Sequence, residues 1–172
     1  NTNPVFRLQN GGNYFDYAHT SGNDLELSYN GGSALIHLAN NGNLGIGVTP
    51  EATQADYDAL QIGGNANITS YGTQGASGQV DYGHNFYYAA SGQDKYISTD
   101  EATQFRQGGG AFRFRTAPSG TADNAITFTE RMTILQAGNV GIGTSTPSRA
   151  LHVVGDALVT GILTAQEFHT EF

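Results

Sequence analysis

The chain has 172 residues, of which 15 are acidic and 7 are basic, and its formal net charge at pH 7 is −8. This balance argues against nucleic-acid binding, which requires a basic footprint, and against attachment to anionic membrane surfaces. Cysteine is absent, which excludes a disulfide framework and thiolate metal sites, and no apolar run is long enough to span a bilayer.

Residue usage favours β structure. There are 24 glycines, and charged residues make up 13% of the chain, against roughly 25% in ordinary globular domains. Apolar and polar residues alternate with period two in several short runs, which are bounded by Gly, Asn, Ser or Pro. These runs are Asp24–Tyr29, Ala34–Ala39, Ala111–Arg115, Ala125–Thr129 and Arg131–Leu135. The pattern predicts an all-β protein.

One segment favours a helix. Glu51–Leu60 follows Thr49 and Pro50, which suit the N-cap and the first position of a helix. A second, weaker helical candidate is Thr164–Phe168.

A six-residue phrase occurs twice. Gly42–Gly47 reads GNLGIG and Gly138–Gly143 reads GNVGIG. Each copy is followed by a Thr-Pro step and then by an Ala-Leu-x-aliphatic element that ends in Gly, at 59–64 and 150–155. A fixed phrase repeated about one domain length apart predicts a serial array of modules.

A weaker repeat lies upstream of each phrase. The matched pairs are Phe6–Gln9 with Phe105–Gln107, Phe15–Tyr17 with Phe112–Phe114, and Leu25–Leu27 with Ile126–Phe128.

The repeated phrase alternates aliphatic residues with glycine. Its aliphatic side chains would face one side of a strand and leave the other side almost bare. Glycine inside a strand is costly unless another backbone approaches closely. Three copies of the chain around one axis would provide that approach, and a glycine-rich turn within a single-chain sandwich explains the pattern equally well. A phosphate-binding loop fits less well, because no Lys-Ser/Thr follows the glycines.

Several longer phrases resemble a known family. Gly138–Gly155, Ala117–Ile126, Lys95–Gln104 and Leu163–Phe168 are similar to segments of bacteriophage tail-fibre proteins. In that family the repeat often precedes an endosialidase-type intramolecular chaperone, which this chain lacks. The similarity covers residues 42–172, and residues 1–41 follow through the internal repeat.

The resemblance implies an extracellular virion appendage, an elongated parallel homotrimer that contacts a receptor on the host surface. We therefore expect Gly-rich β-sandwich modules joined by narrow stems, in a fragment of a longer protein. Residues 1–47 would end a first module with its stem, 48–138 would form a complete β-sandwich knob, and 139–172 would be a stem that leads towards the chaperone. The expected stem contacts are Leu44, Ile46, Val140, Ile142, Leu151 and Val153.

Aromatic residues gather in the middle of the expected knob. Exposed aromatic rings beside amide and carboxylate groups are typical of sugar recognition, because the ring covers C–H patches while the polar groups bind hydroxyls. Packing is the alternative role, and we expect it for most of the tyrosines. In a strand over 84–88, Asn85 and Tyr87 would face one side and Phe86 and Tyr88 the other. The predicted ligand-binding residues are Tyr82, His84, Asn85, Tyr87, Tyr88 and Tyr96.

Catalytic and metal signals are weak. The five histidines show no ligand spacing; His37 or His152 could form an axial threefold site, but ordinary strand positions are favoured. Carboxylate pairs such as Asp56/Asp58 and Asp100/Glu101 arise by chance at this density. We expect no cofactor, no metal and no catalysis. The predicted function is host attachment, most consistent with a cell-surface glycan; the alternatives are a purely structural shaft and, less favoured, a glycan depolymerase.

Overall fold

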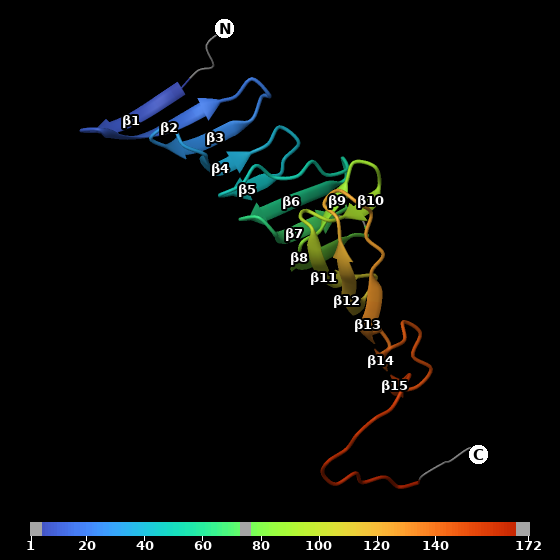
Figure 1. The fold of residues 1–172 in the computed structure, drawn as a ribbon. Helices are drawn as coiled ribbons and strands as arrows, with labels where there is room; N and C mark the ends of the chain where they lie inside the picture. The colour runs from blue at the N-terminus through green and yellow to red at the C-terminus, as the bar shows by residue number, and fades with distance from the viewer. Residues whose placement is uncertain (1–4, 73–76, 168–172) are drawn as a thin grey trace.

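The computed structural model describes residues 5–72 and 77–167, and all regular structure within them is β (Figure 1). The strands follow one another in chain order along an elongated body, with β1 and β15 at opposite ends (Figure 1). The all-β class predicted from alternation is confirmed.

Thirteen strands form one continuous sheet in the described part of the chain. Its members are β1 (Val5–Asn10), β2 (Asn13–His19), β3 (Leu25–Tyr29), β4 (Ala34–Leu38), β5 (Leu44–Ile46), β6 (Tyr57–Ile62), β7 (Ala66–Tyr71), β8 (Gln79–His84), β11 (Asp100–Gly108), β12 (Ala111–Gly120), β13 (Thr129–Ile134), β14 (Val140–Ile142) and β15 (Leu151–Val153). A separate two-stranded sheet contains β9 (Tyr87–Ala89) and β10 (Gln93–Lys95).

Neighbours in the large sheet are antiparallel with two exceptions. β5 pairs in parallel with β6, and β14 pairs in parallel with β15. In each parallel pair the first strand lies within one of the two GNxGIG phrases, and the second strand follows it in the chain. The sheet continues without a break past residues 47 and 138, because the pairs β5–β6 and β13–β14 cross these positions.

Alternation along the strands separates two faces of the sheet. The register places apolar residues opposite one another from β1 to β15, as in Leu8 opposite Phe15 and Phe105 opposite Phe114. We call this side the apolar face. The opposite side, the polar face, carries buried polar residues. They include Asp16, His37, Gln61, Asn67, Thr69, Asp81, Gln104 and Thr133.

A small second layer covers the polar face at its centre. Phe86 is fully buried and meets Phe128 edge-on, with ring centroids 5.8 Å apart. Nearby, Tyr96 packs with Ala102 and Ala117, and partly buried Ile126 and Phe128 lie against this cluster. The hydrophobic core therefore lies under the β9–β10 hairpin, on the polar side of the sheet.

The predicted helix at Glu51–Leu60 is wrong. Thr53 forms a β-bridge with Ala89, and the chain from Tyr57 onward is strand β6. Tyr57, Ala59 and Gln61 are buried at period two, and β6 is held by ladders with both β5 and β7. These two ladders outweigh the local helix signals. Thr164–Glu167 is not helical either, and Phe168 lies outside the described residues.

The GNxGIG repeat is a structural repeat. We call β4–β5–β6 the first unit and β13–β14–β15 the second unit. Ile36 pairs with Ile46 in the first unit as Met132 pairs with Ile142 in the second. Gly47 N–H donates to Leu35, and Gly143 N–H donates to Arg131, each at 2.9 Å. The phrase therefore specifies the same three-strand arrangement twice.

The upstream repeat holds only in part. Phe6 faces Tyr17 as Phe105 faces Phe114, in agreement with the first two matches. The third match fails, because Leu25–Leu27 lies in β3 whereas Ile126 and Phe128 leave the sheet and pack on the small second layer.

The chain does not form one strand over 84–88. β8 ends at His84, and Asn85 has a positive φ of 60°, a conformation that asparagine tolerates better than most residues. Its side chain accepts from Ser98 N–H at 2.7 Å and donates to two backbone carbonyls. Asn85 and Phe86 are both fully buried, so the two-faced strand expected here is wrong.

Candidate interaction surfaces

The apolar face is exposed along the length of the sheet. Phe6 is 62% exposed, and many other large side chains on this face are more than a third exposed. They are Leu8, Phe15, Tyr17, Leu25, Tyr29, Ile36, Leu38, Ile46, Ile62, Ile68, Tyr82, Phe112, Phe114, Ile142 and Leu151. Together they expose on the order of 1,000 Å², well above the ~300–600 Å² of the largest patch on a typical monomer. Exposed apolar patches of this size are typical of interaction sites.

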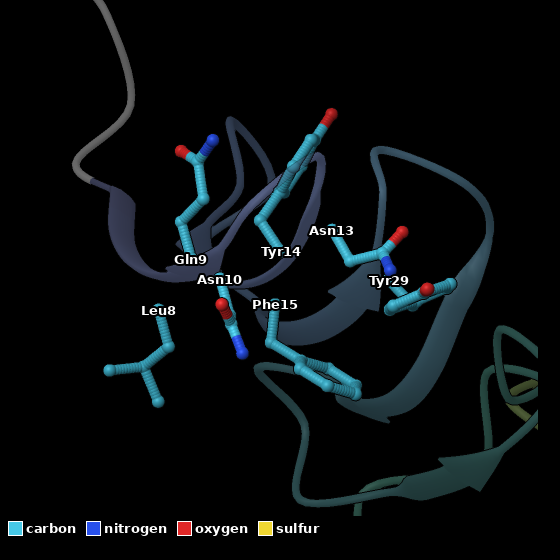
Figure 2. Close-up of a pocket in the computed structure, with 7 residues that line it drawn as sticks. All are labelled: Leu8, Gln9, Asn10, Asn13, Tyr14, Phe15 and Tyr29. Atoms are coloured by element: carbon cyan, nitrogen blue, oxygen red, sulfur yellow. The ribbon is translucent and has the colours of Figure 1, made fainter.

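Three hollows lie along this face. One of about 290 Å³ is lined mainly by Leu8, Phe15 and Tyr29 with neighbouring amides; Figure 2 shows Leu8 and Phe15 on the side of β1–β2 opposite Tyr14. A second, of about 190 Å³, lies between Tyr17 and Leu44, and a third, of about 270 Å³, lies beside Tyr82. The hollows between exposed side chains would accept protruding residues of a partner.

Aromatic rings line the third hollow and contact one another. Phe105 stacks with Phe114 at 4.8 Å and with Phe112 at 6.0 Å, and it lies 6.3 Å from Tyr82. These rings belong to β8, β11 and β12, the central strands of the sheet.

All six predicted stem residues lie on the apolar face. Leu44 pairs with Leu60 and Ile46 with Ile62; Val140 pairs with Leu151 and Ile142 with Val153. Ile46, Ile142 and Leu151 are exposed, and the others are half-buried. The structure therefore brings the predicted stem side chains to one surface.

The close approach that explains the glycines comes from the chain itself. A Cβ added at Gly45 would collide with the carbonyl of Val48 and lie 2.8 Å from Pro50. A Cβ added at Gly141 would collide with the carbonyl of Thr144. The bare side of each phrase thus packs on its own following loop, while the aliphatic side remains exposed.

The predicted ligand-binding residues do not form one surface. Asn85, Tyr87 and Tyr96 are buried, and Tyr82 and His84 lie on the strand positions of the apolar face. The hydroxyl of Tyr87 donates to Asp123 at 2.9 Å, and burial followed by this bond raises its pKa. Of the six, only Tyr88 combines partial exposure with a place on the side of the small second layer.

A half-buried arginine forms an ion pair with a buried carboxylate on the polar face. Arg106 donates through Nε and Nη2 to the two carboxylate oxygens of Asp81, both at 2.8 Å. Burial acts to lower the pKa of Arg106, but the bonds and charge of Asp81 outweigh it and the net direction is upward. Close by, burial raises the pKa of Asp94, and Arg115 donates to Gln104.

A further hollow of about 130 Å³ lies on the polar face. It is lined by Tyr71, Gln79, Arg106, Arg113 and small residues of two segments, 77–78 and 108–109. Tyr71 ends a stack of three tyrosines: its ring lies 4.7 Å from Tyr57, which lies 4.1 Å from Tyr88. Burial raises the pKa of Tyr57, and the charge and hydrogen bonding of Tyr88 raise it further.

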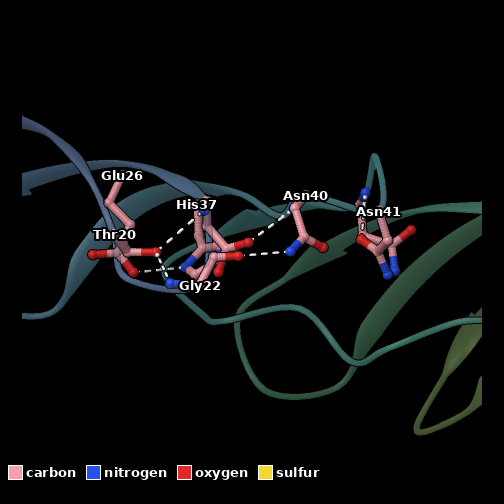
Figure 3. A network of polar contacts seen from close by, with 8 residues as sticks. Thr20, Gly22, Glu26, His37, Asn40 and Asn41 are labelled. Atoms are coloured by element: carbon pink, nitrogen blue, oxygen red, sulfur yellow. Dashed lines mark hydrogen bonds and ion pairs between the residues drawn. The ribbon is translucent and has the colours of Figure 1, made fainter. Parts of the chain in front are cut away.

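His37 lies in a polar network in the first unit (Figure 3). It is 3% exposed, with Nδ1 2.9 Å from Glu26 and Nε2 3.2 Å from Asp24. Asp24 also accepts from Asn40 N–H at 2.8 Å, which ties the β2–β3 turn to the loop after β4. His37 and His152 both lie on the polar face, opposite the aliphatic residues of their units. An axial histidine is thus incompatible with an axis formed by the apolar face.

Metal and membrane features are absent from the part of the chain that the structure describes. No group of three or more His, Cys, Asp or Glu side chains there could hold a metal ion. Over residues 5–72 and 77–167 there is also no helix of the length and apolarity needed to cross a membrane.

Comparisons with known proteins give no family. No family model matches the chain, and no curated protein matches it in sequence.

Sequence reasoning missed the hollow beside Tyr71. Tyr71 is one of the aromatic residues in the middle of the expected knob, but the predicted ligand-binding residues include neither it nor Gln79, Arg106 and Arg113. Alternation in 111–115 already placed Arg113 opposite the face of Phe112 and Phe114. What the sequence lacked was the register that brings Arg113 next to Arg106.

Proposed function

We propose that this chain is a segment of a phage tail fibre, which assembles as a parallel homotrimer and takes part in attachment to the host surface without catalysis. The observation that carries the proposal is the exposed apolar face of a one-layer sheet. Its area, on the order of 1,000 Å² per chain, is comparable with the ~800 Å² per partner of a standard stable interface. The number three rests on the family resemblance.

The geometry suits an elongated assembly. The apolar residues continue from β1 to β15, so an interface built on them would extend along the whole body. The stems predicted at residues 44–46 and 140–153 would lie on the axis side. The β-sandwich knob predicted for 48–138 stays part of the proposal, with β9–β10 and Phe86 as its second layer. Beyond β15, the exposed side chains of Leu158 and Ile162 would add contacts between chains.

The first experiment is the mass in solution, measured by light scattering on a sizing column. We expect three chains for the wild type. Phe114→Asp combined with Ile142→Asp should dissociate the assembly, because both side chains lie on the apolar face. Val5→Asp is the matched control, since Val5 is similarly exposed but lies on the polar face. A stable wild-type monomer would overturn the proposal.

The second experiment separates attachment from the two alternatives. The trimer is incubated with host cells and with polysaccharide extracted from them. Retention without cleavage is the expected result. No retention would favour a purely structural shaft, and release of reducing ends would favour a depolymerase. A depolymerase would need a general acid whose pKa is raised. In the candidate pair Asp100/Glu101, hydrogen bonds with Glu101 instead lower the pKa of Asp100.

A further inference from the structure

The hollow beside Tyr71 differs from the other three by its position. In the proposed trimer the apolar face is covered, so its hollows would be filled by neighbouring chains. The hollow of about 130 Å³ lies on the polar face and would remain open to the surroundings. An open hollow on the outside of a fibre can hold a ligand.

The hollow lies over a row of paired residues that ends in a glycine. Tyr71 pairs with Gln79, and Gln79 pairs with Gly108, so the three positions form one row across β7, β8 and β11. A Cβ at Gly108 would lie only 2.8 Å from the Cβ of Gln79. Gly108 therefore cannot carry a side chain, and the hollow over this row is lined by Tyr71 at one end and by Arg113 of the neighbouring strand β12 near the other.

Tyr71 is a fixed aromatic platform. One side of its ring contacts Tyr57, which is 7% exposed and stacks in turn on Tyr88. Tyr71 itself is 40% exposed. An aromatic ring that is held on one side and open on the other suits the C–H face of a sugar ring.

Two arginines border the hollow, although the chain has few basic residues. Arg106 is held by the buried carboxylate of Asp81 and is thereby oriented. Arg113 donates to the carbonyl of Gly108 at 3.2 Å, and its Nε lies 3.5 Å from Glu130. The latter distance is longer than a charge-assisted hydrogen bond, so Arg113 can turn to a better-placed anion.

We propose that this hollow binds a pyranose unit that carries an anionic group, with the sugar ring on Tyr71 and the anion against Arg113. Gln79 would bind a ring hydroxyl. This inference rests on the proposed function, because it names the site and ligand class of host attachment. The hollow is smaller than the ~300–1,000 Å³ of pockets that enclose drug-sized ligands, so each site should be weak and act through many copies.

The test is a titration of the assembled protein, followed by NMR of labelled tyrosine and arginine. The probes are methyl glucuronide, glucose 6-phosphate and neutral methyl glucoside. We expect the anionic sugars to shift the signals of Tyr71 and Arg113 and the neutral sugar to bind about tenfold more weakly. The two anionic probes distinguish a carboxylate ligand from a phosphate ligand. Equal binding of all three sugars would overturn the role of the arginines.

Amino-acid substitutions test where the sugar binds. Tyr71→Leu and Arg113→Gln should each weaken binding of the preferred sugar about fivefold or more, and Arg113→Lys should retain part of it. The matched control is Tyr14→Leu, because Tyr14 also lies on the polar face beside an arginine, 3.8 Å from Arg7, but far along the sheet. Unchanged binding by Tyr71→Leu on an intact trimer would overturn the site.

Binding to host cells separates this inference from the proposed function. If the wild type binds cells and Tyr71→Leu binds equally well, the fibre attaches elsewhere and the site is wrong. If the anionic sugar binds but cells are not retained, the site stands and host attachment fails.

Discussion

The first and second units share a backbone but differ in surroundings. In each, a loop covers the glycine of a three-residue strand, and an asparagine before that strand bonds to the loop. The first unit lies within the sheet, since β7 and β8 follow β6. The second unit ends the described sheet at β15, where Leu151 is 63% exposed. The repeated phrase thus fixes local geometry, whereas its stability depends on the strands that follow.

The polar residues of the two units differ more than the apolar ones. His37 occupies the position of Thr133, and Gln61 that of His152, by register. The apolar residues at the equivalent positions are all aliphatic or Met. This difference agrees with the proposed assembly, in which the apolar face would be constrained by contact with other chains and the polar face would be free to vary.

The largest effects should come from the glycines at the centre of each phrase. Gly45→Ala and Gly141→Ala should each lower the free energy of unfolding by about 3 kcal/mol or more, because the added Cβ meets backbone rather than a movable side chain. Thermal and denaturant unfolding would measure this. Gly47→Ala is the control: its φ is 69° but the space is open, so about 1 kcal/mol is expected. Equal effects at Gly45 and Gly47 would contradict the collision.

Replacing the asparagine of each phrase should destabilise the first unit more than the second. Asn43 is fully buried, donates to the Glu51 carbonyl at 2.8 Å and to Thr53, and accepts from Ala59 N–H at 3.0 Å. Asn139 donates to the Pro147 carbonyl at 3.2 Å. We expect Asn43→Ala to cost about 2–3 kcal/mol and Asn139→Ala about 1 kcal/mol. Similar losses in urea unfolding would mean that the units are equally well packed.

Replacing His37 by the residue of the second unit should have a smaller effect. His37→Thr removes the group between Asp24 and Glu26, and we expect a loss of about 1 kcal/mol from repulsion between carboxylates that are partly solvated. His19→Thr is the control, because His19 is exposed at the end of β2. Added salt should reduce the loss; a loss that is insensitive to salt would point to packing instead.

The smallest expected effect depends on pH. Burial, followed by the charge of Asp123, raises the pKa of Glu51, which lies in the loop of the first unit. A raised pKa in the folded state means that stability falls as the pH rises through the carboxyl range. Glu51→Gln removes this loss, so its melting temperature should exceed that of the wild type slightly at pH 7 and converge with it below about pH 4. A constant difference across pH would contradict this origin.

Sequence patterns predicted the repeat and the apolar face better than the central region. Period-two alternation sufficed for Leu25–Tyr29 and Ala111–Arg115, because each residue of such a strand has only two possible directions. The sequence wrongly predicted a helix at Glu51–Leu60, because Thr49 and Pro50 resemble a helix start. The strand is evident only from its ladders with β5 and β7. Alternation also failed at Asn85, where one left-handed residue carries the chain out of the sheet.

The candidate site was predictable only in part. Counting aromatics led to Tyr87 and Tyr96, whose hydroxyls instead bond to Asp123 and to the Pro118 carbonyl within the chain. The hollow beside Tyr71 needs Gln79, Gly108 and Arg113 as well, and only the pairing of β7, β8, β11 and β12 brings these residues together. Such a hollow arises from the register of strands that are distant in sequence, and local sequence does not encode it.

The order of the strands has a mechanical consequence. Because each strand pairs with the next along the elongated body, the hydrogen bonds between strands point along its length, and each added strand extends it by about 4.8 Å. Tension along that direction would load the ladders in series, so the chain would yield at its shortest ladders, the three-pair contacts of β5 and β14. These are the places where the aliphatic residues of the repeated phrase would let neighbouring chains share the load.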